Sequence, residues 1–173
     1  KINEASINSK KIKKDDIFFA IKGKKNDGNN FIKESLDKGA SFAVVNKIDR
    51  STKVSKQLLV KDSLKSLTNI SKKVRLNSLA KVIAITGSCG KTSLKELLGN
   101  IFGKISKVSY SPKSYNNKYG VPLSIFNINK HDDFNIFEIG MDKKGEIDLL
   151  SKIIKPDVGV ITNISYAHAK NFK

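Results

Sequence analysis

With 173 residues, of which 39% are hydrophobic and gathered in blocks, the chain is long enough for one ordinary domain or two small ones and is not a disordered chain. No stretch reaches the ~18 apolar positions of a membrane span, and one cysteine with two histidines excludes an internal disulfide and a dedicated zinc cluster. The net charge of +17 comes from scattered lysines, with arginine only at Arg50 and Arg75, so we expect a solvated basic surface and no nucleic-acid partner.

The first half of the chain alternates short apolar runs with helical patterns, which predicts α/β construction. Residues 17–21, 42–45 and 58–60 read as strands. A helix is predicted at residues 30–38, where Gly39 can end it in a left-handed conformation. A second helix is predicted at residues 63–74, with Ser63 as its N-terminal cap.

A polar stretch at residues 72–78 precedes a second unit that we also expect to be α/β, with a mostly parallel sheet. Its strands are predicted at residues 82–85, 107–111, 134–139 and 158–164, and a helix at 147–154. A further helix should follow the first strand and bury Leu94, Leu97, Leu98 and Ile101. These patterns predict two domains, at residues 1–78 and 79–173.

The segment between that strand and helix has the composition of a phosphate-binding loop. Two glycines let consecutive backbone N–H groups converge, and the helix that follows adds the positive end of its dipole. The lysine is expected on the β- and γ-phosphates of ATP, and the threonine hydroxyl on Mg²⁺. The loop is the short Gly-x-x-Gly-Lys-Thr form, because Ile85 stands where longer loops have glycine. The expected nucleotide-binding residues are Gly87, Ser88, Cys89, Gly90, Lys91, Thr92 and Ser93.

Together with four other segments, this loop resembles the Mur ligase family, and the resemblance covers essentially the whole chain. The loop lies in Ile83–Thr92, and the other segments are Ile17–Gly23 with Asp27-Gly28, Tyr115–Leu123, Phe137–Met141 with Gly145-Glu146-Ile147, and Pro156–Ile164 with Ala167-His168. The resemblance implies an N-terminal domain that binds a UDP-linked substrate, followed by a truncated central ATPase domain of the P-loop type. It also implies a cytoplasmic, monomeric enzyme of cell-wall precursor synthesis.

The implied reaction joins an amine to a carboxylate that ATP has first phosphorylated. Lys91, Glu138 and His168 are the expected catalytic residues, and Thr92, Glu138 and His168 the expected Mg²⁺ ligands. Phe137–Met141 favours the family member that joins D-Ala-D-Ala to UDP-MurNAc-tripeptide over the sister ligase that adds the diamino acid. The family's C-terminal domain has no counterpart here, so we expect an incomplete fragment that does not ligate alone.

Some positions allow more than one interpretation. Asn116 and Asn117 either bind phosphate or substrate, or form the turn before a helix that starts at Gly120. Ser9, Lys22 and Gly28 are candidate substrate contacts, although Asn8-Ser9-Lys10 replaces the family's Asp-Ser-Arg and leaves uridine-nucleotide contacts there open. Likewise, the residues after His168 depart from the family's Leu-Glu-Gly.

Two other classes of protein remain as alternatives. Asn46-Lys47-Ile48-Asp49 and Asp142-Lys143-Lys144-Gly145 fit the guanine-reading and Asp-x-x-Gly patterns of a circularly permuted GTPase. The short loop argues against that class, because GTPases use the longer form. The second alternative is a non-catalytic basic module that binds RNA, and the phosphate loop argues against it.

Overall fold

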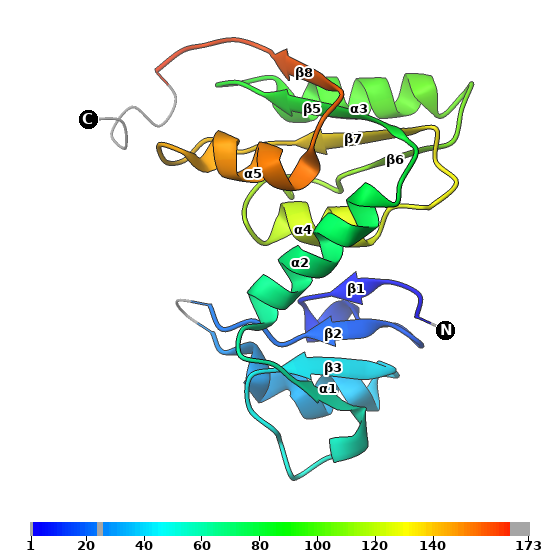
Figure 1. The fold of residues 1–173 in the computed structure, drawn as a ribbon, viewed down its shortest axis with the longest axis vertical. Coiled ribbons are helices and arrows are strands. Elements are labelled where there is room, and N and C mark those ends of the chain that lie inside the picture. The colour runs from blue at the N-terminus through cyan, green and yellow to red at the C-terminus, as the bar shows by residue number, and fades with distance from the viewer. Residues whose placement is uncertain (1, 24–25, 167–173) are drawn as a thin grey trace. The chain divides into compact units, whose positions relative to one another are not determined.

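A computed structural model describes residues 2–23 and 26–166. The chain forms two compact units, Lys1–Ile70 and Ser71–Lys173. Figure 1 labels their α-helices and all of their strands except β4 (Gln57–Leu59). The division falls inside helix α2 (Ser63–Leu76), eight residues before the boundary that the sequence suggests. The second half of α2 bonds within the second unit, since the Ser71 hydroxyl donates to the carbonyl of Pro122 at 2.6 Å.

The first unit is a four-stranded, wholly parallel sheet in the order β1-β2-β3-β4. Its strands are β1 (Ala5–Ser6), β2 (Ile17–Phe19), β3 (Phe42–Val45) and β4 (Gln57–Leu59). Helix α1 (Ile32–Asp37) and the 3-10 segments η1 (Ser9–Lys11), η2 (Gly28–Phe31) and η3 (Val54–Lys56) complete it. The core consists of Ile12, Phe18, Ala20, Ile32, Ala40, Ala43 and Val45. The strands and the helix predicted here are therefore confirmed, with shifts at their ends.

The start of α2 differs from the prediction. Asp62, not Ser63, accepts a hydrogen bond from a first-turn amide, that of Lys65 at 2.9 Å. The Ser63 hydroxyl instead donates to Oδ1 of Asn46 at 3.0 Å. The predicted cap is wrong because Ser63 is buried against the end of β3, where its hydroxyl donates to the carbonyl of Val44 and is not used to accept from the amides of its own helix.

The second unit is also a four-stranded parallel sheet, in the order β6-β7-β5-β8. Its strands are β5 (Lys81–Thr86), β6 (Val108–Tyr110), β7 (Phe134–Glu138) and β8 (Val158–Ile161). Its helices are α3 (Lys91–Phe102), α4 (Gly120–Phe126) and α5 (Glu146–Ile154). The expected α/β class with parallel sheets is confirmed. None of the described helices is long and apolar enough to cross a bilayer.

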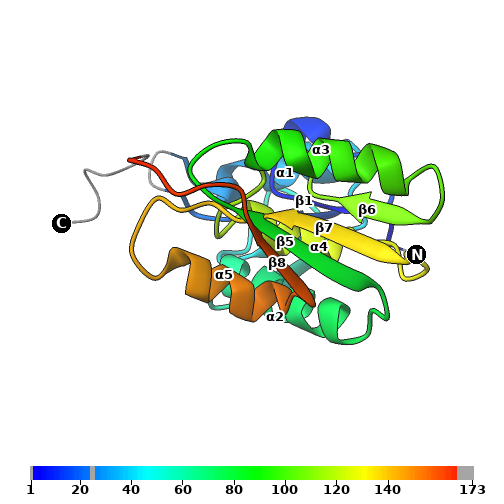
Figure 2. The same ribbon diagram turned by 90° about the horizontal axis from the view of Figure 1, so that it is seen from above.

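Helices cover both faces of this second sheet. Helices α4 and α5 pack on one face with Val82, Ala84, Phe137 and Ile139, and Figure 2 shows α3 on the opposite face. The side of α3 that we expected to be buried is only partly so, because Leu97 and Ile101 are exposed while Lys95 and Gly99 are buried. A Cβ on Gly99 would lie 2.6 Å from the Tyr110 ring, so glycine lets α3 approach β6 closely.

Candidate nucleotide-binding site

The loop after β5 has a backbone that glycine alone adopts easily at two positions. Gly87 and Gly90 have φ angles of +133° and +79°, in the left-handed region. A Cβ on Gly87 would also lie 2.2 Å from Oγ1 of Thr162. The loop runs directly into α3, which begins at Lys91, so the amides at the start of that helix face the loop. This is the strand–loop–helix junction that the sequence predicts.

The Lys91 side chain is folded over the loop. Its Nζ donates to the carbonyl of Gly87 at 2.5 Å and lies 3.4 Å from that of Ser88. These carbonyls hold the ammonium where the phosphate chain of a nucleotide would lie in a loop of this type.

Glu138 is a buried carboxylate beside this loop. It ends β7 and pairs in register with Ile85 of β5, two residues before Gly87. The side chain is 1% exposed, and both of its oxygens accept hydrogen bonds. Oε2 accepts from the Thr92 hydroxyl at 2.7 Å, and Oε1 accepts from Nδ2 of Asn116 at 2.7 Å. Three expected site residues from separate segments thus meet at one carboxylate.

The donor set at this point suits Mg²⁺, which prefers hard oxygen ligands and commonly takes one or two from protein and the others from phosphates and water. Thr92 supplies a hydroxyl and Glu138 a carboxylate, 2.7 Å apart. Within residues 2–23 and 26–166, no group of three or more His, Cys, Asp and Glu side chains could hold a metal. The expected third ligand, His168, lies outside the described residues.

A segment that we did not assign to the site closes against the loop. After β8, Asn163 accepts from the amides of Ser88 and Cys89, each at 3.0 Å, through its carbonyl oxygen and its side-chain Oδ1 respectively. The Ser88 hydroxyl donates to the carbonyl of Ser165 at 3.0 Å. The sequence placed Thr162 and Asn163 inside a predicted strand, 158–164, so nothing in it marked them as loop contacts; in the structure β8 ends at Ile161 and pairs with the strand of the loop.

The remaining expected nucleotide contacts have other surroundings. Asn117 is a turn residue, since its Oδ1 accepts from the amides of Tyr119 and Gly120, each at 3.0 Å, ahead of α4. Ser93 faces solvent on the first turn of α3, and Cys89 is an exposed free thiol. Asn116 and Asn117 therefore differ: the first contacts Glu138, and the second shapes the helix start.

The three candidate substrate contacts belong to the first unit. Ser9 is buried and donates to Oε2 of Glu34 at 2.7 Å. Lys22 forms an antiparallel bridge with Asp27. Hydrogen bonds from Asn29 and the charge of Lys22 lower the pKa of Asp27 below its ordinary value. Gly28 packs on backbone, where a Cβ would lie 2.5 Å from the amide nitrogen of Ile21. Close packing therefore explains why this position needs a glycine.

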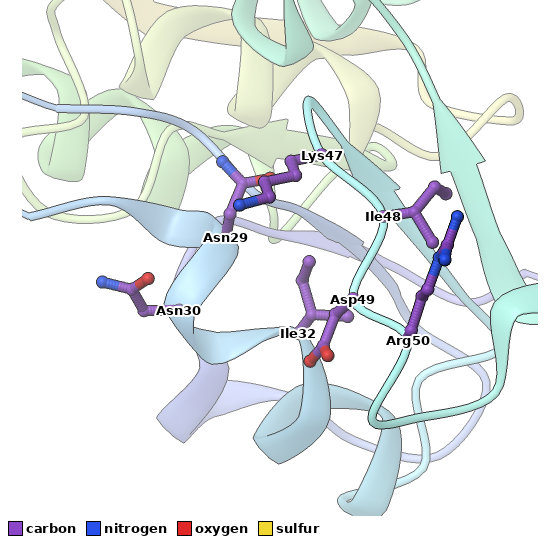
Figure 3. Close-up of a pocket in the computed structure, with 7 residues that line it drawn as sticks. All are labelled: Asn29, Asn30, Ile32, Lys47, Ile48, Asp49 and Arg50. Atoms are coloured by element: carbon purple, nitrogen blue, oxygen red, sulfur yellow. The ribbon is translucent and has the colours of Figure 1, made fainter.

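Asn46 and Asp49, two residues of the guanine-reading pattern, form hydrogen bonds within the first unit. Nδ2 of Asn46 donates to the carbonyls of Val60 and Lys61 at 3.3 and 3.0 Å. Asp49 accepts from the amide and hydroxyl of Ser51, and these bonds lower its pKa. Asp49 also lines an open pocket of about 670 Å³. Figure 3 shows its lining residues, Asn29, Asn30, Ile32, Lys47, Ile48, Asp49 and Arg50. Asn46 and Asp49 are thus bound within their own unit, which argues against the GTPase alternative.

Parallel strands, a glycine loop and the helix that follows it define an α/β protein of the P-loop type. A protein-family model described as the Mur ligase middle domain matches residues 85–173 of the sequence. A second, described as the Mur ligase family, catalytic domain, matches residues 1–87. The chain therefore belongs to the Mur ligase family.

One relative and two solved structures illustrate what this chain is similar to. UDP-N-acetylmuramoyl-tripeptide–D-alanyl-D-alanine ligase of Rickettsia prowazekii is 39% identical over 98% of this chain and 38% of the relative. MurF from Acinetobacter baumannii has a TM-score of 0.86 at 34% identity, over 98% of this chain and 37% of the other. MurF from Thermotoga maritima, solved in complex with ADP, has a TM-score of 0.80 at 34% identity, over 96% and 38%.

The chain thus spans under two fifths of the length of these relatives. A structure named UDP-N-acetylmuramoyl-L-alanyl-D-glutamate–2,6-diaminopimelate ligase, the sister activity, has a TM-score of 0.52 at 16% identity. That likeness concerns the fold alone.

Proposed function

We propose that this chain supplies the ATP-binding loop and the UDP-substrate unit of an ATP-dependent ligase that joins D-Ala-D-Ala to UDP-MurNAc-tripeptide. The observation that carries the proposal is the meeting of Thr92 and Asn116 on the buried carboxylate of Glu138, beside the glycine loop. The likeness to MurF chains, among them one solved with ADP, supports the same assignment.

In this proposal the residues 87–93 bind the phosphates of ATP. Lys91 holds the β- and γ-phosphates, and loop amides donate to their oxygens. Thr92 and Glu138 hold Mg²⁺, and by resemblance His168 is a further ligand. The ion supplies positive charge where the transferred phosphoryl group accumulates negative charge. The γ-phosphoryl group passes to the substrate carboxylate, ADP leaves, and the amine of D-Ala-D-Ala then displaces phosphate from the acyl phosphate.

The first unit is proposed to hold the UDP-linked substrate, with residues 1–78 as the substrate domain and 79–173 as the ATP-binding part. Ser9 and Lys22 are the side chains that we propose as contacts, and Gly28 shapes the backbone between them and α1. The protein is proposed to act as a monomer in the cytoplasm. The basic surface implied by the net charge of +17 favours two polyanionic substrates, ATP and a UDP conjugate.

The test is a titration of the ¹⁵N-labelled chain with ATP and Mg²⁺, followed by NMR. We expect the amide signals of residues 86–93 to shift, and GTP to compete poorly with a fluorescent ATP analogue. Lys91→Ala should weaken nucleotide binding roughly 10- to 100-fold, because a charged hydrogen-bond donor contributes about 1.5–3 kcal/mol.

Lys104→Ala is the matched control, since Lys104 is an exposed lysine just beyond α3. That variant should bind like the original chain. A folded sample whose signals at residues 86–93 do not respond to Mg²⁺ and ATP would overturn the proposal. An affinity for GTP equal to that for ATP would restore the GTPase alternative.

A further inference from the structure

Lys95 is a buried cation with no part in the proposed reaction. It lies one turn after Thr92 on α3, and its side chain is completely shielded from solvent. Its Nζ donates to the carbonyl of Lys113 at 2.5 Å and pairs with Oε1 of the half-exposed Glu96 at 3.0 Å. A buried ammonium is costly unless it is paired, so these contacts explain how it is tolerated but not what it does.

The partner carbonyl belongs to a loop that contacts Glu138 at both ends. We call residues 111–116 the β6–α4 loop. At its start, the Ser111 hydroxyl oxygen accepts from the backbone amide of Glu138 at 3.2 Å. At its end, Asn116 donates to Oε1 of Glu138 and accepts from the amide of Gly140 at 2.6 Å. In the middle of the loop, the carbonyl of Lys113 accepts the hydrogen bond from Lys95.

The loop adopts a conformation that needs such support. Lys113 has a φ of +48°, which lies in the left-handed region. Residues other than glycine adopt this backbone conformation at a cost in free energy, and they keep it where the surrounding structure imposes it. Within the loop, the amide of Tyr115 donates to the carbonyl of Pro112 at 3.2 Å. The Lys95 bond comes from outside the loop and ties its centre to α3.

We propose that Lys95 is a positioning residue for the magnesium–nucleotide site. Residues three apart on a helix share a face, so Thr92 and Lys95 project from the same side of α3. Thr92 bonds Glu138 directly, and Lys95 holds the β6–α4 loop that places Asn116 on the same carboxylate. The inference rests on the proposed function of Glu138 as a Mg²⁺ ligand and extends it to the residues that orient this carboxylate.

The test replaces Lys95 by methionine in the 173-residue chain, which keeps an unbranched side chain one atom shorter and removes the ammonium. Binding of a fluorescent ATP analogue is measured against Mg²⁺ concentration and again in EDTA. We call the Mg²⁺ concentration that gives half of the Mg²⁺-dependent binding the Mg²⁺ midpoint. We expect it to rise about 10- to 100-fold, as for other residues that orient metal ligands. Affinity in EDTA should stay within about twofold, because the loop amides and Lys91 are untouched. A purely structural role would lower both affinities together.

Four further variants make the result specific. Asn116→Ala should raise the Mg²⁺ midpoint in the same way, and the double variant with Lys95→Met should show less than the sum of the two effects. Lys104→Met controls for the loss of one lysine charge, and Glu96→Gln for the loss of the ion pair alone. Both should leave the midpoint unchanged.

Two outcomes overturn the inference: a folded Lys95→Met chain with the original Mg²⁺ midpoint, and additive effects in the double variant. If Lys95→Met does not fold, NMR of the original chain decides. The amide signals of Lys113 and Asn116 should shift on addition of Mg²⁺ to the ATP-bound chain, and their failure to shift contradicts the inference. Failure of the proposed function is distinct, because the original chain would then bind no ATP analogue in either condition.

Discussion

Asn163 contacts Cys89 with both halves of its side-chain amide. Oδ1 accepts from the Cys89 backbone N–H at 3.0 Å, and Nδ2 lies 2.8 Å from Sγ. In Asn163→Ala we expect the Cys89 amide to exchange with solvent hydrogen roughly five- to tenfold faster, because one hydrogen bond contributes about 1 kcal/mol to its protection. NMR-detected hydrogen exchange measures this directly.

The neighbouring amide is an internal control. The Ser88 N–H donates to the backbone carbonyl of Asn163, which the alanine variant retains, so its exchange rate should hardly change. Equal acceleration at Ser88 and Cys89 would mean that the whole segment had moved, and would contradict a specific role for the side chain.

Replacing Glu138 by glutamine should reduce Mg²⁺-dependent ATP binding. Glutamine keeps the size of the side chain but loses the negative charge that a hard cation requires. We expect the Mg²⁺ midpoint to rise at least about tenfold, corresponding to roughly 1.4 kcal/mol. Calorimetric titration with Mg²⁺ at saturating ATP provides the measurement.

Asp148→Asn is the matched control for this loss of a carboxylate. Asp148 is exposed on α5 and pairs with the exposed Lys152 at 2.7 Å. The Asp148→Asn variant should keep the Mg²⁺ midpoint within about twofold of the original chain's value, since an exposed ion pair of this kind contributes little to stability. A Glu138→Gln chain with the same midpoint as Asp148→Asn would argue against a metal at this carboxylate.

The sequence predicted the parallel α/β folds and the loop because both depend on local signals. Continuous apolar runs fit strands buried on both faces, and Gly87 and Gly90 have the φ angles that their residue type suggested. The family resemblance singled out Glu138, and its place at the end of such a run agrees with that expectation. Since parallel strands bring their carboxyl ends to one edge, a polar residue at that point lies near the loop.

The burial of α3 and the role of Asn163 depend on contacts that the spacing of apolar residues does not encode. Periodicity placed Leu97 and Ile101 inside, but the close approach of Gly99 to the Tyr110 ring sets which side of α3 faces the sheet. Asn163 meets Cys89 across 74 residues of sequence, and no local pattern marks that pairing.

Gly28→Ala tests whether this glycine serves packing. An added Cβ would lie 2.5 Å from the amide nitrogen of Ile21 and 2.7 Å from the carbonyl carbon of Ala20, both rigid backbone atoms. We expect the free energy of unfolding to fall by about 1–3 kcal/mol, the usual cost of overpacking. Gly23→Ala should cost less, because its Cβ would meet one carbonyl oxygen at 3.3 Å. Urea unfolding compares the two variants, and equal effects would contradict the packing explanation.

Asp157 should make the stability of the second unit depend on pH. Its Oδ2 accepts from the Val82 amide at 2.8 Å, and it pairs with Arg75 at 3.3 Å and with Lys81 at 3.7 Å. The Val82 hydrogen bond first, and then the charges of Lys81 and Arg75, lower the pKa of this carboxyl below its ordinary 3.8. A carboxyl group with a lowered folded-state pKa stabilises the fold above its unfolded-state pKa and loses that contribution as the pH falls through the folded value.

The Asp157→Asn variant isolates this contribution, because other carboxyl groups titrate alike in both chains. We expect the original chain to be more stable than the variant near pH 6 and the difference to shrink as the pH falls below 3.8, where Asp157 becomes protonated. Urea unfolding between pH 2 and pH 6 measures the difference. A difference that stays constant across that range would mean that the carboxylate charge contributes nothing to the free energy of unfolding, and that Asp157 acts through its hydrogen bond with Val82, which asparagine can also accept.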